Sequence, residues 1–181
     1  MSPFRFPRTV DDVTVRVIAG EVLVLAVLAA ATRQPWVYGV LALDFVVRAA
    51  LGPVLSPLAR FAATVVRPRV PAAPRPTPGP PKRFAAAIGA VLTSVATVAY
   101  YAAGWHTVAW VVGAVMVVFP LLEAALGLCV GCIAFSLLMR LGVIPRSVCE
   151  ECADITRRLS AARRSELSAV PRVQVAKTFS R

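Results

Sequence analysis

The sequence predicts an all-α, polytopic membrane protein whose four transmembrane helices form two hairpins, joined by a Pro-rich cytoplasmic loop and followed by a cytoplasmic tail. Three observations predict this class. Hydrophobic residues make up 58% of the 181-residue chain and charged residues only 16%, against roughly 25% charged residues in soluble domains. Residues 84–122 contain no Asp, Glu, Lys or Arg, although one span needs only about 20 residues. Lys and Arg also concentrate in alternate loops, as four crossings require.

The first hairpin is predicted over residues 13–52, after a cytoplasmic segment of residues 1–12. Its two spans, residues 13–31 and 36–52, are separated by a short polar turn. Charged residues interrupt both spans, and each is therefore expected to be weaker by hydropathy than the third span.

A cleaved signal peptide is the alternative interpretation of the first span. The small residues at positions 29–31 follow an apolar stretch, as they do before a cleavage site. However, Asp11, Asp12 and Glu21 occupy positions that are basic or apolar in signal peptides. A retained span is the better interpretation.

The two hairpins are separated by a basic, Pro-rich cytoplasmic loop, residues 53–83. Residues 68–81 include seven prolines, which exclude a regular helix and predict an extended tether. Before it, residues 56–67 place apolar side chains at helical spacing, which predicts a short helix on the inner leaflet. An unstructured linker fits this stretch almost as well.

The second hairpin is predicted over residues 84–140, with helices over residues 84–103 and from residue 107 onward. A continuous helix over residues 107–139 would be about 50 Å long, but the bilayer core is about 30 Å thick. The last helix must therefore tilt, break near Pro120 or Gly127, or project into the cytoplasm. Gly127 also begins a G-x-x-x-G motif that permits close approach of another helix in lipid.

Positive charge predicts the orientation. Basic residues gather before the first span, in the loop of residues 53–83 and in the tail of residues 156–181, and the cytoplasmic segment of residues 141–155 before the tail carries Arg146. Both termini are therefore expected in the cytoplasm. Much of the formal charge of +11 would then contact anionic lipid headgroups. Nucleic acid is not an expected partner, because no aromatic platform or recognition motif accompanies the charge. The tail shows no sustained apolar face and is expected to be disordered.

Four cysteines form two C-x-x-C pairs on the predicted cytoplasmic side, Cys129 with Cys132 and Cys149 with Cys152. Their spacing falls in the range of zinc sites, and four thiolates would form a closed structural site. The alternative is a redox relay, in which one pair exchanges with the other or with a soluble partner. Arg146, the nearest cation in sequence, favours Cys149 as the nucleophile. Inert packing of the cysteines is a third interpretation.

Charged residues inside the predicted spans form a second candidate site. Asp44 and Arg48 are four residues apart on one helix face, and Glu21 and Glu123 could join them in an intramembrane polar cluster. Charges at membrane depth are functional candidates by default. We nevertheless favour a structural pin over an ion or proton pathway, because the spans offer little other polar lining.

Five short blocks of the sequence resemble a bacterial integral membrane family called domain of unknown function 4395. The blocks are PRTVDD at residues 7–12, DFVVRA at 44–49, GPVLSPLAR at 52–60, GPPKRF at 79–84 and EAALGLCVGC at 123–132. The resemblance covers roughly residues 7–154. It implies a membrane protein without an established activity. The family's association with thioredoxin-like and sulfurtransferase proteins implies a partner of that kind.

The sequence therefore predicts a multi-pass membrane protein with a thiol redox or sulfur-handling role. One alternative is a non-enzymatic scaffold with a structural zinc site, and another is a small carrier that uses the intramembrane charges. Hydrolases and nucleotide-dependent enzymes have no support, because the chain lacks their motifs.

Overall fold

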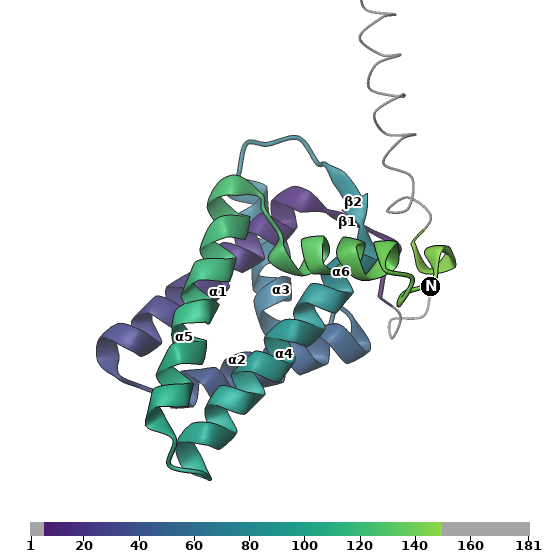
Figure 1. The fold of residues 1–181 in the computed structure, drawn as a ribbon. Helices are drawn as coiled ribbons and strands as arrows, with labels where there is room; N and C mark the ends of the chain where they lie inside the picture. Colours follow the sequence, from purple (N-terminus) through teal and green to yellow (C-terminus); the bar gives the residue numbers. More distant parts are fainter. Residues whose placement is uncertain (1–5, 150–181) are drawn as a thin grey trace, which may run out of the picture.

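The computed structural model describes residues 6–149 and is mostly helical, with one two-stranded antiparallel sheet (Figure 1). Cys152, residues 150–155 and the predicted tail over residues 156–181 lie outside the described residues. The elements in chain order are β1 (Thr9–Asp11), α1 (Asp12–Thr32), α2 (Trp36–Leu51), α3 (Pro57–Phe61), η1 (Ala62–Val66), η2 (Arg67–Arg69), β2 (Pro76–Pro78), α4 (Gly79–Tyr101), α5 (His106–Leu121), η3 (Leu122–Leu126), α6 (Val130–Arg140) and η4 (Arg146–Val148).

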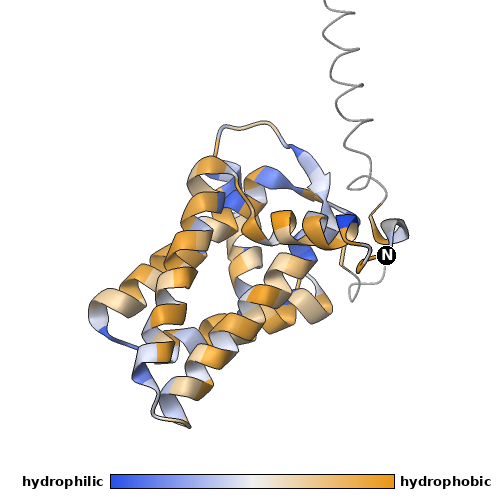
Figure 2. Cartoon of the chain, in the orientation of Figure 1, coloured by the Kyte–Doolittle hydropathy of each residue, from blue (hydrophilic) through white to orange (hydrophobic). Residues whose placement is uncertain are grey.

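Among residues 6–149, three helices are long and apolar enough to cross a membrane, and they indicate a membrane protein. They are Asp12–Thr32, Gly79–Tyr101 and His106–Leu126, with α5 and η3 forming the third. Figure 2 shows hydrophobic residues along their lengths and hydrophilic residues gathered near their ends. The predicted second span corresponds to α2, which has only 16 residues, fewer than the about 20 of a usual span. Four crossings therefore stay a prediction.

The helices pack across the two predicted hairpins as well as within them. Within the first hairpin, α1 and α2 meet only along part of their length, whereas α2 packs extensively on α4 and α1 packs on α5. Small residues allow these close approaches. At Gly89 of α4, an added Cβ would lie 2.7 Å from the ring of Phe45 on α2. The main core accordingly combines residues of all four helices: Val22, Ala26, Ala29, Val37, Tyr38, Leu41, Phe45, Ala86, Ala90, Ala96 and Met116.

The Pro-rich stretch before α4 is partly ordered by the N-terminal strand. Residues 76–78 form β2 and pair antiparallel with β1, so that Thr9 lies opposite Pro78. The helix α4 then begins at Gly79, earlier than the predicted residue 84. Proline is tolerated there because the first N–H groups of a helix have no partner within it. Over residues 56–67, where a short helix was predicted, the structure has α3 followed directly by η1.

Asp11 ties this end of the molecule together. Its carboxylate caps α1 by accepting hydrogen bonds from the N–H groups of Val13 and Thr14. It also accepts from Nε of Arg67 at 2.8 Å and from the N–H of Arg75 at 2.8 Å. Burial alone would raise the pKa of Asp11, but these hydrogen bonds hold it well below its usual range. The segment from η2 to β2 is thereby anchored to the start of α1.

The last predicted helix breaks at Gly127, one of the outcomes that the sequence left open. Gly127 has a φ of 70°, a left-handed conformation that ends a helix and favours glycine. By contrast, Pro120 lies inside α5, which continues into η3. Gly127 and Gly131 consequently do not share one helix face. Gly131 alone supports the close approach of α6 to α4, because an added Cβ would lie 2.5 Å from the Cβ of Ala85.

We expect Gly131→Ala to lower stability and Gly20→Ala to leave it unchanged or raise it. Both glycines are helical, where alanine is intrinsically favoured by roughly 0.5–1 kcal/mol. An added Cβ at Gly20 meets nothing within 4 Å, whereas overpacking against Ala85 costs about 1–3 kcal/mol. Thermal unfolding in detergent, followed by circular dichroism, measures both. Equal stability of the two variants would contradict the close contact between α4 and α6.

Candidate functional site

The first C-x-x-C pair lies at the N-terminus of α6. After the break at Gly127 the chain is extended, and Cys129 becomes the N-cap of the new helix. Its Sγ accepts a hydrogen bond from the N–H of Cys132 at 3.3 Å. The structure therefore places Cys129 before the first turn of α6 and Cys132 within it. This position favours a thiolate on Cys129, because helix N-termini carry unpaired N–H groups and partial positive charge.

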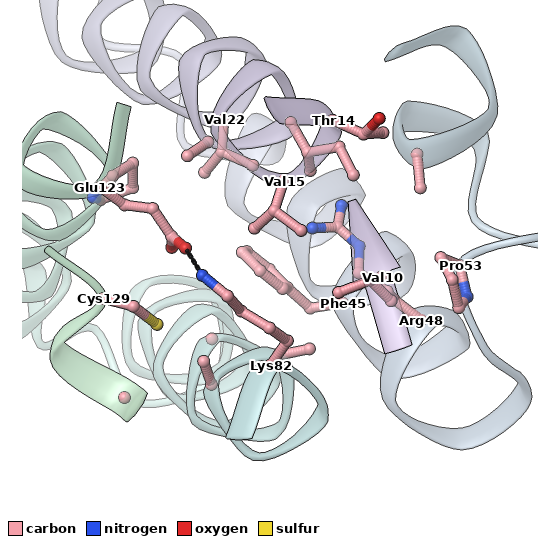
Figure 3. A pocket seen from close by; sticks show the side chains of 18 of the residues that line it. Val10, Thr14, Val15, Val22, Phe45, Arg48, Pro53, Lys82, Glu123 and Cys129 are labelled. Atoms are coloured by element: carbon pink, nitrogen blue, oxygen red, sulfur yellow. Dashed lines mark hydrogen bonds and ion pairs between the residues drawn. The ribbon is translucent and has the colours of Figure 1, made fainter. Parts of the chain in front are cut away.

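A half-buried lysine from another helix lies beside Cys129. Lys82, in the first turn of α4, donates a hydrogen bond from Nζ to Oε1 of Glu123 at 2.7 Å. Its Nζ also lies 3.7 Å from Oδ1 of Asp12. Figure 3 shows Cys129 next to this ion pair, with its sulfur toward the Lys82 side chain. The ammonium group thus faces two carboxylates and a thiol.

The pKa values of the two thiols are shifted in opposite directions. The hydrogen bond that the thiol of Cys132 donates lowers the pKa of Cys129, and Lys82 lowers it further. Burial and the nearby carboxylate of Glu123 act in the opposite direction but do not reverse this shift. The pKa of Cys132 is raised, first by the same hydrogen bond and then by burial and the charge of Cys129. Of the two thiols, Cys129 is therefore the one that loses its proton more easily.

Two cavities meet at this pair. A cavity of about 850 Å³, here named the bundle cavity, lies among α1, α2, α4 and α5 and reaches Lys82, Glu123 and Cys129 (Figure 3). A second cavity of about 530 Å³, here named the α6 cavity, is lined by Asp12, Thr77, Lys82, Gly127, Leu128, Cys129, Cys132, Ile133, Ser136, Leu137 and Arg140. Cys129 and Lys82 line both cavities, but Cys132 lines only the second.

The second C-x-x-C pair is only partly described. Cys149 is buried in a separate apolar cluster with Phe135 and Met139. It lines neither the bundle cavity nor the α6 cavity. Within residues 6–149, no group of three or more His, Cys, Asp or Glu side chains is placed to hold a metal ion. Because Cys152 lies outside the described residues, the four-cysteine zinc site stays a prediction.

The predicted intramembrane polar cluster is divided in the structure. Asp44 and Arg48 form an ion pair on α2, and Oδ1 of Asp44 accepts hydrogen bonds from Oγ of Ser56 at 2.7 Å and the N–H of Leu58 at 3.0 Å. Glu123 instead pairs with Lys82. The two carboxylate oxygens of Glu21 are buried and accept no hydrogen bond from the described residues. The bonds of Asp44 favour a structural pin between α2 and α3.

Sequence reasoning missed Lys82 as a site residue. Its position in a basic loop marked it only as one of many lipid-facing charges. The signal that could have identified Lys82 is its position at the start of an apolar span, because a charge at that depth needs a partner.

We expect Lys82→Met and Glu123→Gln to change the acidity of Cys129 in opposite directions. Loss of the cation should raise the pKa of Cys129, and loss of the carboxylate should lower it. The measurement is the initial rate of iodoacetamide alkylation of Cys129 against pH, followed by mass spectrometry of its peptide. If both variants move the midpoint in the same direction, the ion pair does not set the reactivity of this thiol.

Comparison with known proteins finds one match. No curated protein and no solved structure is significantly similar to the chain. One family's sequence model matches residues 10–140. The matched region extends from β1 to the last residue of α6, so it includes Lys82, Glu123 and the first C-x-x-C pair but neither Cys149 nor Cys152. Because this region covers most of the 181 residues, the chain belongs to the family described as domain of unknown function (DUF4395).

Proposed function

We propose that the protein is a membrane thiol–disulfide oxidoreductase in which Cys129 is the nucleophile and Cys132 the resolving thiol. The observation that carries the proposal is the position of Cys129, at the N-cap of α6 beside Lys82, where it accepts a hydrogen bond from the N–H of Cys132. Nucleophilic cysteines require a nearby cation or a helix N-terminus, and this thiol has both.

The reaction is a two-step exchange. The thiolate of Cys129 attacks one sulfur of a partner disulfide, so that a mixed disulfide forms and the second partner sulfur leaves as a thiolate and takes a proton. Cys132 then loses its proton and attacks Sγ of Cys129. The mixed bond breaks, the Cys129–Cys132 disulfide forms and the partner leaves as a dithiol. Two electrons move to the partner, and the reverse sequence returns them.

The α6 cavity is the place where a soluble partner would reach both sulfurs. It exposes Cys129 and Cys132 together, with Lys82 and Arg140 on its walls. A thioredoxin-like or sulfurtransferase protein, the partner that the family resemblance implied, would dock here. This side would face the cytoplasm, because basic residues accumulate there. Both termini would lie on the same side, and the chain would cross the inner membrane four times. The family resemblance implies that the membrane is that of a bacterium. In the cytoplasm thiols stay reduced unless they cycle.

The test is reversible disulfide formation in the purified full-length protein in detergent. In a glutathione redox buffer, we expect a Cys129–Cys132 disulfide that forms and breaks with the ratio of oxidised to reduced glutathione, as quantified by mass spectrometry. Cys132→Ser should accumulate a mixed disulfide between Cys129 and glutathione, whereas Cys129→Ser should form none.

The matched control is the double variant Cys149→Ser/Cys152→Ser, which should exchange like the natural chain. Loss of exchange in this control, with exchange retained in Cys129→Ser, would overturn the assignment of the nucleophile. About one zinc ion per chain in protein prepared without chelator, with thiols that react only after chelation, would favour the structural zinc alternative instead.

A further inference from the structure

The bundle cavity is mainly apolar, with polar groups confined to a few places. Most of its wall consists of aliphatic, aromatic and small side chains from the core of the helix bundle, among them Val15, Ile18, Val22, Phe45, Leu92 and Met116. At one wall lie the ion pair of Lys82 with Glu123 and the sulfur of Cys129 (Figure 3). At about 850 Å³ it has the size and lining of a site for a lipophilic small molecule.

Cys129 connects this cavity to the α6 cavity. A ligand in the bundle cavity would meet the sulfur of Cys129 but not that of Cys132, which lines only the α6 cavity. Polar or charged thiol carriers such as glutathione would have to lose their hydration to enter an apolar cavity, at high cost. The redox reactant that fits this cavity is therefore lipophilic and carries two electrons, as a dithiol requires.

We infer that the bundle cavity binds a quinone, whose ring lies against Lys82 and Cys129 and accepts two electrons from the Cys129–Cys132 dithiol. This inference rests on the proposed dithiol function and names its electron acceptor. The acceptor oxygens of a quinone match the N–H donors of Lys82 at this wall. Its isoprenoid chain matches the apolar remainder of the cavity.

The charges of the cavity favour a neutral ligand over an anionic lipid headgroup. The ammonium group of Lys82 is already paired with Glu123 at 2.7 Å. Arg48, a buried cation on the wall, is paired with Asp44. The third cation, Arg60, is exposed. Because Lys82 and Arg48 both have carboxylate partners, a phosphate group would have to displace an acid, whereas a quinone oxygen only adds a hydrogen bond.

The redox step balances with these groups alone. The S–H bond of Cys132 breaks and an S–S bond forms between Cys129 and Cys132, which releases two electrons. The quinone takes both electrons, and its two C=O groups become C–OH groups. One proton comes from Cys132. The other is the proton that Cys129 lost when it became a thiolate, returned through solvent in the α6 cavity. The dithiol is oxidised and the quinone becomes a hydroquinone.

The experiment uses the reduced full-length protein in nanodiscs without oxygen, with a short-chain, fully substituted ubiquinone analogue, because its ring has no open position for permanent thiol addition. We expect one hydroquinone per Cys129–Cys132 disulfide formed. Val15→Trp, which fills the bundle cavity, should slow quinone reduction at least tenfold while exchange with glutathione disulfide stays unchanged. The matched control is Val24→Trp on the same helix, where the side chain is 57% exposed and lines neither cavity.

The outcomes separate the two proposals. Exchange with glutathione without quinone reduction, or equal quinone reduction by Val15→Trp and the natural chain, overturns the quinone site and leaves the proposed function standing. Loss of a bound phospholipid in Val15→Trp, with quinone reduction unaffected, assigns the cavity to lipid and also overturns it. If no reversible Cys129–Cys132 disulfide forms under either condition, the proposed function fails first.

Discussion

The ion pair of Lys82 with Glu123 is the interaction on which the arrangement of the site depends. An ammonium group taken out of water costs several kcal/mol unless acids surround it. Lys82 meets Glu123 at 2.7 Å and Asp12 at 3.7 Å, and these three residues come from α4, η3 and α1. The two ion pairs of Lys82 therefore hold α1, α4 and η3 together, directly beside the first residue of α6.

A helix break places Cys129, the nucleophile of the proposed reaction, beside this ion pair. If α5, η3 and α6 formed one helix, Cys129 would lie in its interior, where its neighbouring N–H groups would already be bonded. The left-handed residue Gly127 ends the helix, so that Cys129 becomes an N-cap and receives the N–H of Cys132. The cation and the helix start act on the same sulfur, although they come from segments far apart in the sequence.

The sequence was informative where local composition determines the structure. Long apolar runs predicted the three long helices, and the length of the last run required a break of which Gly127 was one candidate. Properties that depend on tertiary packing were not predictable. Sequence distance favoured Arg146 as the cation beside Cys149, which stays a prediction. Lys82 reaches Cys129 only through the packing of α4 against α6, which sequence distance does not indicate. The packing of α2 on α4 left no periodic signal either, because both helices are apolar on most faces.

Two features of the helix bundle keep the bundle cavity open: the ion pairs on its wall and the small residues between them. Arg48 is held by Asp44 and Ser56 on one side, and Lys82 is held by Glu123 on the other, so the helices cannot collapse inward without breaking charged contacts. Between these pins the wall includes Ala19, Ala86 and Gly89, whose side chains are too small to fill the space. Larger aliphatic residues would have closed it at a gain in burial. The apolar space ends at the sulfur of Cys129, which is the arrangement that the proposed lipophilic reactant requires.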